Sequence, residues 1–319
     1  MAVSLLASVV LIVLQAIVLV ALAPLLSGTI RRTKARLQSR RGASIWQPYR
    51  DLRKWWSKET VQSATASPIQ GVAPAVVLAV TLCALFLVPT VAAAAPLPGW
   101  GDLIAVVGLL AAARFMVALA ALDSGSAFGG MGSSRDVSIA ALVEPALVLA
   151  LIVAAVTFGS TDLGAIAASG AASGLGLLTP AHAVAAVAFA IVVVAESGHH
   201  PVDNPDTHLE LTMVHEGMLL EASGRRLALY MLAAHLRQAL MLALFLAVFV
   251  PWGIAAEIAP VPLALGVVFF VAKLLLAGQG LALADALVPK LRILRLPEFL
   301  GVAAALALVA LAARVWLPA

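Results

Sequence analysis

SLLASVVLIVLQAIVLVALAPLL, at residues 4–26, contains no charged side chain. Since a helix rises about 1.5 Å per residue, this run is long enough to cross the roughly 30 Å hydrocarbon core of a bilayer. Apolar runs of similar length recur along the chain, and we expect each to form a membrane-spanning helix: 72–95, 103–122, 137–158, 180–197, 228–252, 261–283 and 299–317. The pattern predicts an all-α integral membrane protein of about eight transmembrane helices, in a single polytopic domain of residues 1–319.

The composition excludes a water-soluble fold. Of the 319 residues, 63% are hydrophobic and 11% are charged, with a mean hydropathy of +1.06, whereas soluble domains carry roughly 25% charged residues. We interpret the first run as a retained helix because it is too long for a signal peptide and its basic residues follow it. Cys83 is the single cysteine, so this chain alone builds no disulfide and no cysteine-ligated cluster.

Basic residues are confined to alternate connections between the predicted spans. The first connection is the most basic, with Arg31, Arg32, Lys34, Arg36, Arg40, Arg41, Arg50, Arg53, Lys54 and Lys58. By the positive-inside rule, the polar connections 27–71, 123–136, 198–227 and 284–298 are cytoplasmic and both termini lie outside. The net charge of +4 and the pI near 9.6 then describe one face of an inner-membrane protein, so we expect no nucleic-acid partner.

The first connection, RRTKARLQSRRGASIWQPYRDLRKWWSKE at 31–59, predicts a helix that lies on the membrane surface. Beyond Gly42, aromatic residues such as Trp46 and Trp56 alternate with cations such as Arg50 and Arg53 at near-helical spacing. Aromatic side chains at the headgroup level with cations in the polar layer are typical of an interfacial amphipathic helix. A docking surface for a soluble partner explains the same pattern.

Several ionisable residues fall inside the predicted spans: Arg114, Glu144, His182, Glu196, His235, Arg237 and Lys273. A charge there costs on the order of 3 kcal/mol, so each needs a partner or a water path. Counted from the cytoplasmic ends, Glu144 lies about 10 Å deep and Arg114 and Arg237 about 14 Å, while Lys273 falls near mid-membrane. This distribution predicts a half-channel that protons enter from the cytoplasm and leave sideways into a neighbouring subunit.

We assign different roles to the acids and the bases of this set. Glu144 and Glu196 are the expected proton carriers, because a buried carboxyl can exchange protons near neutral pH and an arginine cannot. Arg114, Arg237 and Lys273 are expected to supply counter-charge. The alternative is that all of these residues form structural ion pairs that hold helices together.

The fifth connection, ESGHHPVDNPDTHLELTMVHEGMLLEASGRR at 196–226, is rich in acids and histidines. It fits neither a zincin, since Leu219 stands where the second histidine would be, nor an EF-hand calcium loop. We expect its carboxylates to face a wet cavity and exchange protons beside a partner's redox centre. The glycine-rich stretch GSAFGGMGSSRD at 125–136 lacks the phosphate-loop spacing. We predict a flexible turn there, with close backbone packing against a partner as the alternative.

Four segments resemble one family of membrane proteins. RRGASIWQPYRDLRKWW, in the first connection, resembles the first cytoplasmic loop of respiratory complex I subunit 1 and its hydrogenase relatives. ARFMVALAALDSGSAFGGMGSSRD at 113–136, HPVDNPDTHLELTMVHEGMLLEASG at 200–224 and PKLRILRLPEFLG at 289–301 resemble the family of formate hydrogenlyase subunit 4 and hydrogenase-4 component C.

The resemblance implies a non-catalytic anchor in a membrane-bound oxidoreductase. Such a subunit carries a nickel–iron-hydrogenase-like large subunit and an iron–sulfur small subunit, beside antiporter-like membrane subunits, and holds no cofactor of its own. Quinone contact is implied only for complex I. The proton path carried over from the family comprises Glu144, Glu196, Asp203, Glu210, Glu216 and Glu221. The partner-docking residues carried over are Arg40, Arg41, Gln47, Pro48, Asp51, Lys54 and Asp136.

The sequence departs from the family at three positions. Ala222 replaces a tyrosine at the docking face, while Asp136 and Asp285 stand where glutamates are commoner. Aspartate keeps the charge, so the proton path could survive. Other functions remain open at this point: a stand-alone ion transporter or channel, a complex I-type quinone-chamber subunit, or an anchor without a proton path.

Overall fold

The computed structural model describes residues 2–63, 65–93, 101–203, 213–289, 291 and 295–316. These residues form helices and no strand, apart from two isolated β-bridges, Ala92–Ala255 and Asp102–Asp162. In chain order the helices are α1 (Ala2–Leu37), α2 (Gln47–Trp56), α3 (Pro68–Leu87), α4 (Leu103–Asp123), α5 (Ala127–Phe158), α6 (Leu163–Ala172), the 3₁₀ helix η1 (Gly174–Leu177), α7 (Pro180–Glu196), α8 (His215–Leu219), α9 (Gly224–Phe249), α10 (Pro260–Leu287) and α11 (Leu296–Trp316).

The prediction of an all-α membrane protein is confirmed. Seven of the described helices are long and apolar enough to cross a membrane, namely α1, α3, α4, α5, α9, α10 and α11. The fifth predicted span, 180–197, is the 17-residue helix α7, which is about 26 Å long at 1.5 Å per residue. The predicted surface helix in the first connection is present as α2.

Polar residues and prolines define where the helices begin. Ser67, Asp102, Asp162 and Thr179 precede α3, α4, α6 and α7, and each side chain accepts a hydrogen bond from a backbone N–H of the first turn. Proline stands in the first turn of α2, α3, α7 and α10, where its missing N–H leaves no helical bond unmade. Both signals fix the residue at which these helices start.

The predicted flexible turn at 125–136 is wrong. Helix α5 begins at Ala127, so the connection 123–136 shrinks to the few residues around Gly125, which has φ +67°. Glycine serves here to bring backbones close together: a Cβ on Gly129 would lie 2.7 Å from the carbonyl oxygen of Ala121, and one on Gly132 would lie 3.0 Å from that of Val214. These glycines pack α5 against α4 and against the start of α8.

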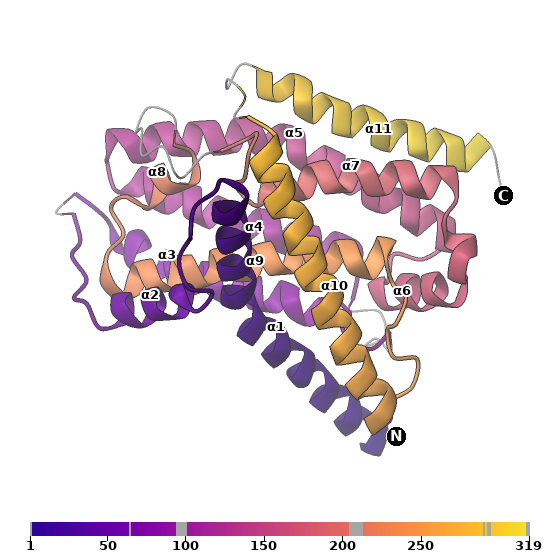
Figure 1. Ribbon diagram of the computed structural model, residues 1–319. Helices are drawn as coiled ribbons and strands as arrows, with labels where there is room; N and C mark the ends of the chain where they lie inside the picture. The colour runs from indigo at the N-terminus through magenta and orange to yellow at the C-terminus, as the bar shows by residue number, and fades with distance from the viewer. Residues whose placement is uncertain are drawn as a thin grey trace.

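Most helices run roughly along one direction, while α1 and α10 cross the others obliquely and lie against each other (Figure 1). Helices α2 and α8 lie at one end of the molecule and α6 at the opposite end. Both chain termini point toward the α6 end. Helix α6 is a short element that the sequence analysis did not anticipate, within the connection between the fourth and fifth predicted spans.

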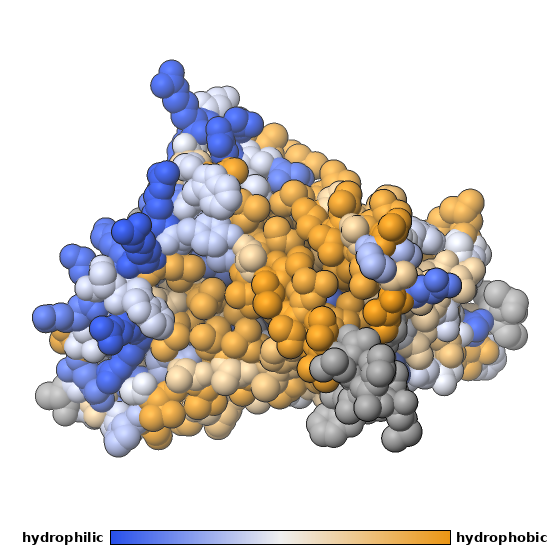
Figure 2. Space-filling view, turned by 90° about the horizontal axis from the view of Figure 1, so that it is seen from below, coloured by the Kyte–Doolittle hydropathy of each residue, from blue (hydrophilic) through white to orange (hydrophobic). Residues whose placement is uncertain are grey.

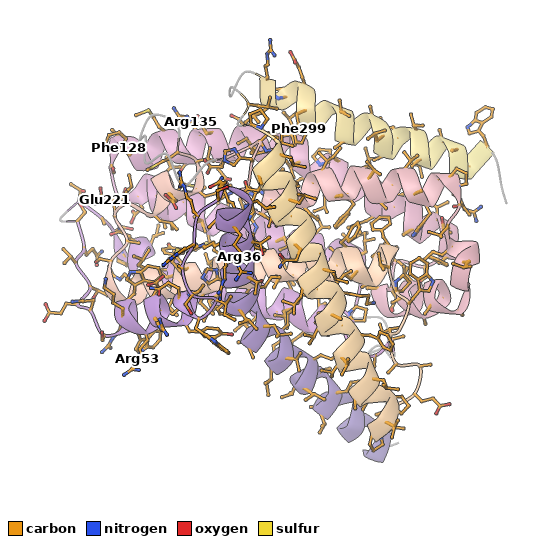
Figure 3. The ribbon with its side chains drawn as sticks, viewed as in Figure 1. Arg36, Arg53, Phe128, Arg135, Glu221 and Phe299 are labelled. Carbon is orange, nitrogen blue, oxygen red and sulfur yellow. The ribbon has the colours of Figure 1, made fainter. Side chains whose placement is uncertain are left out.

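The surface divides into a broad hydrophobic belt and a hydrophilic end (Figure 2). The hydrophilic residues gather at the α2 end, where Arg53, Arg135 and Glu221 lie (Figure 3). Helices α10 and α11 bury little of their apolar surface within this chain. Lipid or a neighbouring membrane subunit must cover that surface, because apolar patches of this extent are not left in water.

Helix α9 forms the centre of the bundle. Leu236, Leu240, Met241 and Leu244 are fully buried and pack with residues of α1, α5, α7 and α11 in one core cluster. Phe245 and Phe249 of α9 stack with Phe189 of α7, at ring separations of 5.5–6.1 Å. A rigid α9 matters for function because it also carries two of the polar residues described next.

Candidate functional site

A buried ionic cluster lies where α4, α7 and α9 meet. Glu196, the last residue of α7, is 7% exposed. One carboxylate oxygen pairs with Nη2 of Arg114 on α4 and the other with Nη2 of Arg237 on α9. Both oxygens of the carboxylate are therefore engaged, as a buried charge requires.

Arg114 extends this cluster to α5. Its Nη1 lies 3.5 Å from Oε1 of Glu144, and its Nε lies 3.7 Å from Oδ2 of Asp136. Arg114 is 6% exposed. One guanidinium thus faces three carboxylates, which arrive from two helices far apart in the sequence.

His215 continues the network into the fifth connection. Its Nε2 lies 3.5 Å from Oδ1 of Asp136, and its Nδ1 lies 3.2 Å from Oδ2 of Asp203. The backbone N–H of His215 also donates to Oδ2 of Asp203, over 3.2 Å. Asp203 thereby fixes the start of α8 and places the His215 ring between two carboxylates.

A second polar cluster surrounds Asp285 of α10. Its Oδ2 lies 2.9 Å from Nζ of Lys34 and 3.4 Å from Nδ1 of His199, and its Oδ1 accepts the backbone N–H of His200 over 2.8 Å. Gln238 joins this cluster through its contact with Nε2 of His199, at 2.7 Å. Residues 199–203 form a turn that links the two clusters. His199 and His200 contact Asp285 at one end, and Asp203 contacts His215 at the other.

The structure brings together four of the residues predicted to carry or balance charge: Arg114, Glu144, Glu196 and Arg237. Asp203 joins them through His215. Glu216 and Glu221 are exposed near α8, and the predicted proton carrier Glu210 lies outside the described residues. Sequence reasoning missed His199, His215, Lys34 and the role of Asp285, because only the fold brings these residues together.

Lys273 does not join the ionic clusters. Its ammonium donates to the carbonyl oxygens of Val250, over 2.8 Å, and Trp252, over 2.9 Å. These carbonyls follow the C-terminal end of α9, where the partial negative charge of a helix favours a cation. In this chain, Lys273 therefore balances the partial negative charge at the C-terminal end of α9.

The predicted docking residues fall into exposed and buried groups. Arg40, Arg41 and Lys54 are exposed, and Gln47 donates to Asp51 across one turn of α2, over 2.8 Å. Pro48, in the first turn of α2, is buried, and Asp136 is 1% exposed. Neither side chain therefore lies on the surface of the isolated chain.

Helix α2 is held tightly against the bundle. The Tyr49 hydroxyl donates to the carbonyl oxygen of Ala21 on α1, and burial raises the pKa of Tyr49. A Cβ on Gly28 of α1 would overlap the carbonyl oxygen of Ile45, and one on Gly224 would overlap that of Glu59. The exposed face of α2 is therefore presented by a fixed scaffold.

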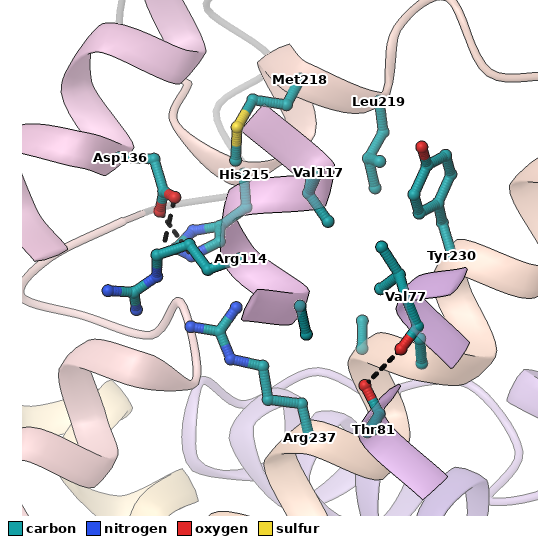
Figure 4. Close-up of a pocket in the computed structure, with 13 residues that line it drawn as sticks. Val77, Thr81, Arg114, Val117, Asp136, His215, Met218, Leu219, Tyr230 and Arg237 are labelled. Atoms are coloured by element: carbon teal, nitrogen blue, oxygen red, sulfur yellow. Dashed lines mark hydrogen bonds and ion pairs between the residues drawn. The ribbon is translucent and has the colours of Figure 1, made fainter. Parts of the chain in front are cut away.

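A cavity of about 80 Å³ adjoins the ionic cluster (Figure 4). Its walls come from α3, α4, α5, α8 and α9, and Arg114, Asp136, His215, Tyr230 and Arg237 line it. Among the described residues, no group of three or more His, Cys, Asp or Glu side chains could hold a metal ion.

Known proteins resemble this chain over most of its length. A family model described as NADH dehydrogenase matches residues 9–315. Hydrogenase-4 component C of Escherichia coli (strain K12) is 38% identical over 82% of each chain. Formate hydrogenlyase subunit 4 of the same organism is 36% identical over 88% of this chain and 90% of its own length.

A solved structure shares the fold. A chain of the membrane-bound sulfane sulfur reductase, an archaeal respiratory membrane complex, superposes with a TM-score of 0.80. The match covers 95% of this chain and 99% of that one, at 22% identity. The extent of the family match and the identity to these two relatives show that the chain belongs to the NADH dehydrogenase family, with hydrogenase-4 component C and formate hydrogenlyase subunit 4 among its relatives.

Proposed function

We propose that this chain is the membrane-anchor subunit of a hydrogenase-4 or formate hydrogenlyase-like complex related to complex I. Its relatives are named as a component and a subunit of such assemblies. The fixed, cation-rich α2 end offers a surface for soluble subunits. The partners expected there are a nickel–iron-hydrogenase-like large subunit and an iron–sulfur small subunit, which would carry the redox centres.

The α2 end is the cytoplasmic end in this proposal. The exposed cations Arg40, Arg41, Arg50, Arg53 and Lys54 gather there, whereas the α6 end holds the acids Asp102 and Asp162. By the positive-inside rule, both termini then lie outside. The membrane in this proposal is the inner (plasma) membrane.

The anchor also carries protons between the docked enzyme and a neighbouring membrane subunit. The observation that supports this role is the row of titratable groups Asp203, His215 and Asp136, which Arg114 connects to Glu144 as a fixed counter-charge. Glu144 lies within the membrane span α5, yet its side chain is 38% exposed in the isolated chain. A carboxylate at that depth needs a partner, and an antiporter-like subunit packed against α5 would provide one.

Purification of this chain from its native membranes in mild detergent tests the anchor role. We expect hydrogenase-like and iron–sulfur subunits to co-purify in fixed stoichiometry, identified by mass spectrometry. Reversing the charge of the docking face, as in an Arg40→Glu, Arg41→Glu variant, should release them because the exposed cations no longer complement the partner. A chain that is consistently recovered alone would return the stand-alone transporter to first place.

A Glu144→Gln variant tests the proton path. It keeps the shape of the side chain and removes the group that exchanges a proton, so electron transfer in the complex should persist while proton uptake by inverted membrane vesicles is lost. Glu257→Gln is the matched control, because Glu257 is exposed at the opposite end. Unchanged proton uptake in Glu144→Gln would leave an anchor whose buried charges are purely structural.

A further inference from the structure

Helix α2 carries three stripes of side chains, because residues three or four positions apart lie on the same side of a helix. Pro48, Leu52 and Trp55 form the stripe that packs against the bundle: Pro48 is buried and the other two are half-buried. A further stripe runs along each edge of this packed one. The two flanking stripes differ in chemistry, so they suit different partners.

The first flanking stripe is aromatic and cationic. It consists of Trp46, which immediately precedes α2, followed at intervals of three or four residues by Tyr49, Arg53 and Trp56. Trp46 and Trp56 are 53% and 54% exposed, and Arg53 is exposed as well. The Trp46 and Tyr49 rings lie 5.6 Å apart. We call these four residues the aromatic stripe.

The second flanking stripe is polar. Gln47, Asp51 and Lys54 have the same spacing, and the Gln47 side chain donates to Asp51 over 2.8 Å. This stripe combines an amide, a carboxylate and an ammonium, a mixture typical of the polar rim of a protein interface. The aromatic stripe, by contrast, has a cation and no acid among its four residues.

The aromatic stripe is turned toward the bilayer. The Tyr49 hydroxyl donates to the carbonyl oxygen of Ala21, which belongs to the uncharged apolar run 4–26 in α1. Arg53 points downward from α2 in Figure 3, and this is the side that Figure 2 shows, where the hydrophobic belt meets the hydrophilic end. The stripe therefore lies at the boundary between hydrocarbon and water, at the depth of the lipid headgroups.

A phospholipid headgroup matches the chemistry of this stripe. Indole rings prefer the interfacial layer, where their N–H groups can donate to lipid oxygens. A guanidinium binds a phosphate through two parallel N–H···O bonds. Because the stripe adds a cation and no carboxylate, a lipid with a net negative charge is favoured over a zwitterionic one.

We propose that the aromatic stripe is a binding site for an anionic phospholipid, whose phosphate pairs with Arg53 between the rings of Trp46 and Trp56. The close approach of Gly28 to Ile45 and of Gly224 to Glu59 holds both ends of the α2 segment in place, so the site is fixed before the lipid arrives. The polar stripe is left for the soluble subunits of the proposed function. The lipid site needs only the membrane and does not rest on those subunits.

Quenching of tryptophan fluorescence by brominated lipids tests the site. The full chain is reconstituted in phosphatidylcholine vesicles, in which brominated phosphatidylglycerol or brominated phosphatidylcholine replaces a rising share of the lipid. We expect brominated phosphatidylglycerol to reach half-maximal quenching at about a fivefold lower share, the preference that one cation near an anionic headgroup supplies. A Trp46→Phe, Trp56→Phe variant should lose this difference. Equal quenching by the two lipids in the wild-type chain would overturn the site.

Arg53→Gln separates a defined site from diffuse surface charge. Arg53 is exposed, so the variant should fold, and it should bring the two brominated lipids to equal quenching. Lys54→Gln is the matched control, because it removes the same charge one residue along the helix, on the polar stripe. This control should keep the preference for phosphatidylglycerol. Equal losses in the two variants would show a diffuse attraction of the hydrophilic end to anionic lipid and would overturn the site.

The same measurement on the purified complex identifies the occupant, taken as the difference from a complex that carries Trp46→Phe and Trp56→Phe. We expect the selective quenching to persist there, because lipid and not a subunit covers the stripe. Quenching that disappears on assembly would assign the stripe to a partner protein and overturn the lipid site.

These outcomes are separate from those of the proposed function. A chain that is recovered alone but retains the selective quenching would remove the anchor role and keep the lipid site. Partners that co-purify with a chain without lipid preference would keep the anchor role and overturn the lipid site.

Discussion

Replacing Glu196 with leucine should lower the free energy of unfolding by about 3–5 kcal/mol, the cost of removing one partner from a buried ion pair. Glu196 is 7% exposed and pairs with both Arg114 and Arg237. Leucine would leave two guanidinium groups facing each other beside apolar side chains. The loss is measurable as reduced thermal stability in detergent and as a smaller yield of folded protein from membranes.

Glu144→Gln is the control for this prediction. The Glu144 side chain is 38% exposed and makes one ion contact with the described residues, of 3.5 Å, with Arg114, so the substitution should cost about 1 kcal/mol or less. Equal losses for the two variants would contradict the assignment of Glu196 as the central charge.

A compensating variant shows whether unpaired charge causes the loss. Combining Glu196→Leu with Arg237→Met removes the cation whose carboxylate partner among the described residues is lost, while Arg114 keeps Asp136 and Glu144. Replacing a buried pair by apolar residues is often close to neutral, so the double variant should recover much of the stability. Purely additive losses would indicate that packing, and not charge, dominates at this position.

The membrane spans could be predicted because the bilayer leaves few alternatives. Backbone groups in hydrocarbon must be satisfied internally, so a long apolar run forms a helix. The predictions were wrong where hydropathy does not determine the local structure. Gly129 and Gly132 suggested a turn, yet their value is close contact with Ala121 and Val214, which depends on helices distant in sequence.

The ionic site was only partly predictable for a related reason. Charges within spans are conspicuous in the sequence, so Arg114, Glu144, Glu196 and Arg237 could be selected from hydropathy alone. His215 and Asp136 stand outside or at the edge of the predicted spans, and nothing local indicates that one contacts the other. The predicted role of Lys273 was likewise incomplete, because its partners are backbone carbonyls and these have no sequence signature.

Asp285→Asn should release the turn at 199–203 from α10 and α1. Asparagine keeps the size of the side chain but removes the counter-charge of Lys34, whose side chain is 13% exposed, while that of Asp285 is 1% exposed. Losing this ion contact should cost about 1–3 kcal/mol. Hydrogen–deuterium exchange should rise in a peptide covering 199–203, because the backbone N–H of His200 loses a charged acceptor.

Lys34→Met is the reciprocal test, and Asp102→Asn the matched control at the other end of the molecule. Asp102 caps α4 through the N–H of Ile104, and asparagine caps a helix about as well as aspartate, so this variant should change neither the stability nor the exchange at 199–203 appreciably. If Lys34 and Asp285 act as one pair, the double variant should lose less stability than the sum of the two single losses. The turn would then be held at both ends by side-chain contacts, between Asp285 and His199 at one end and between Asp203 and His215 at the other. A change at either carboxylate would therefore alter the geometry of the proposed proton path. Additive losses with unchanged exchange would show instead that the turn holds its shape without Asp285.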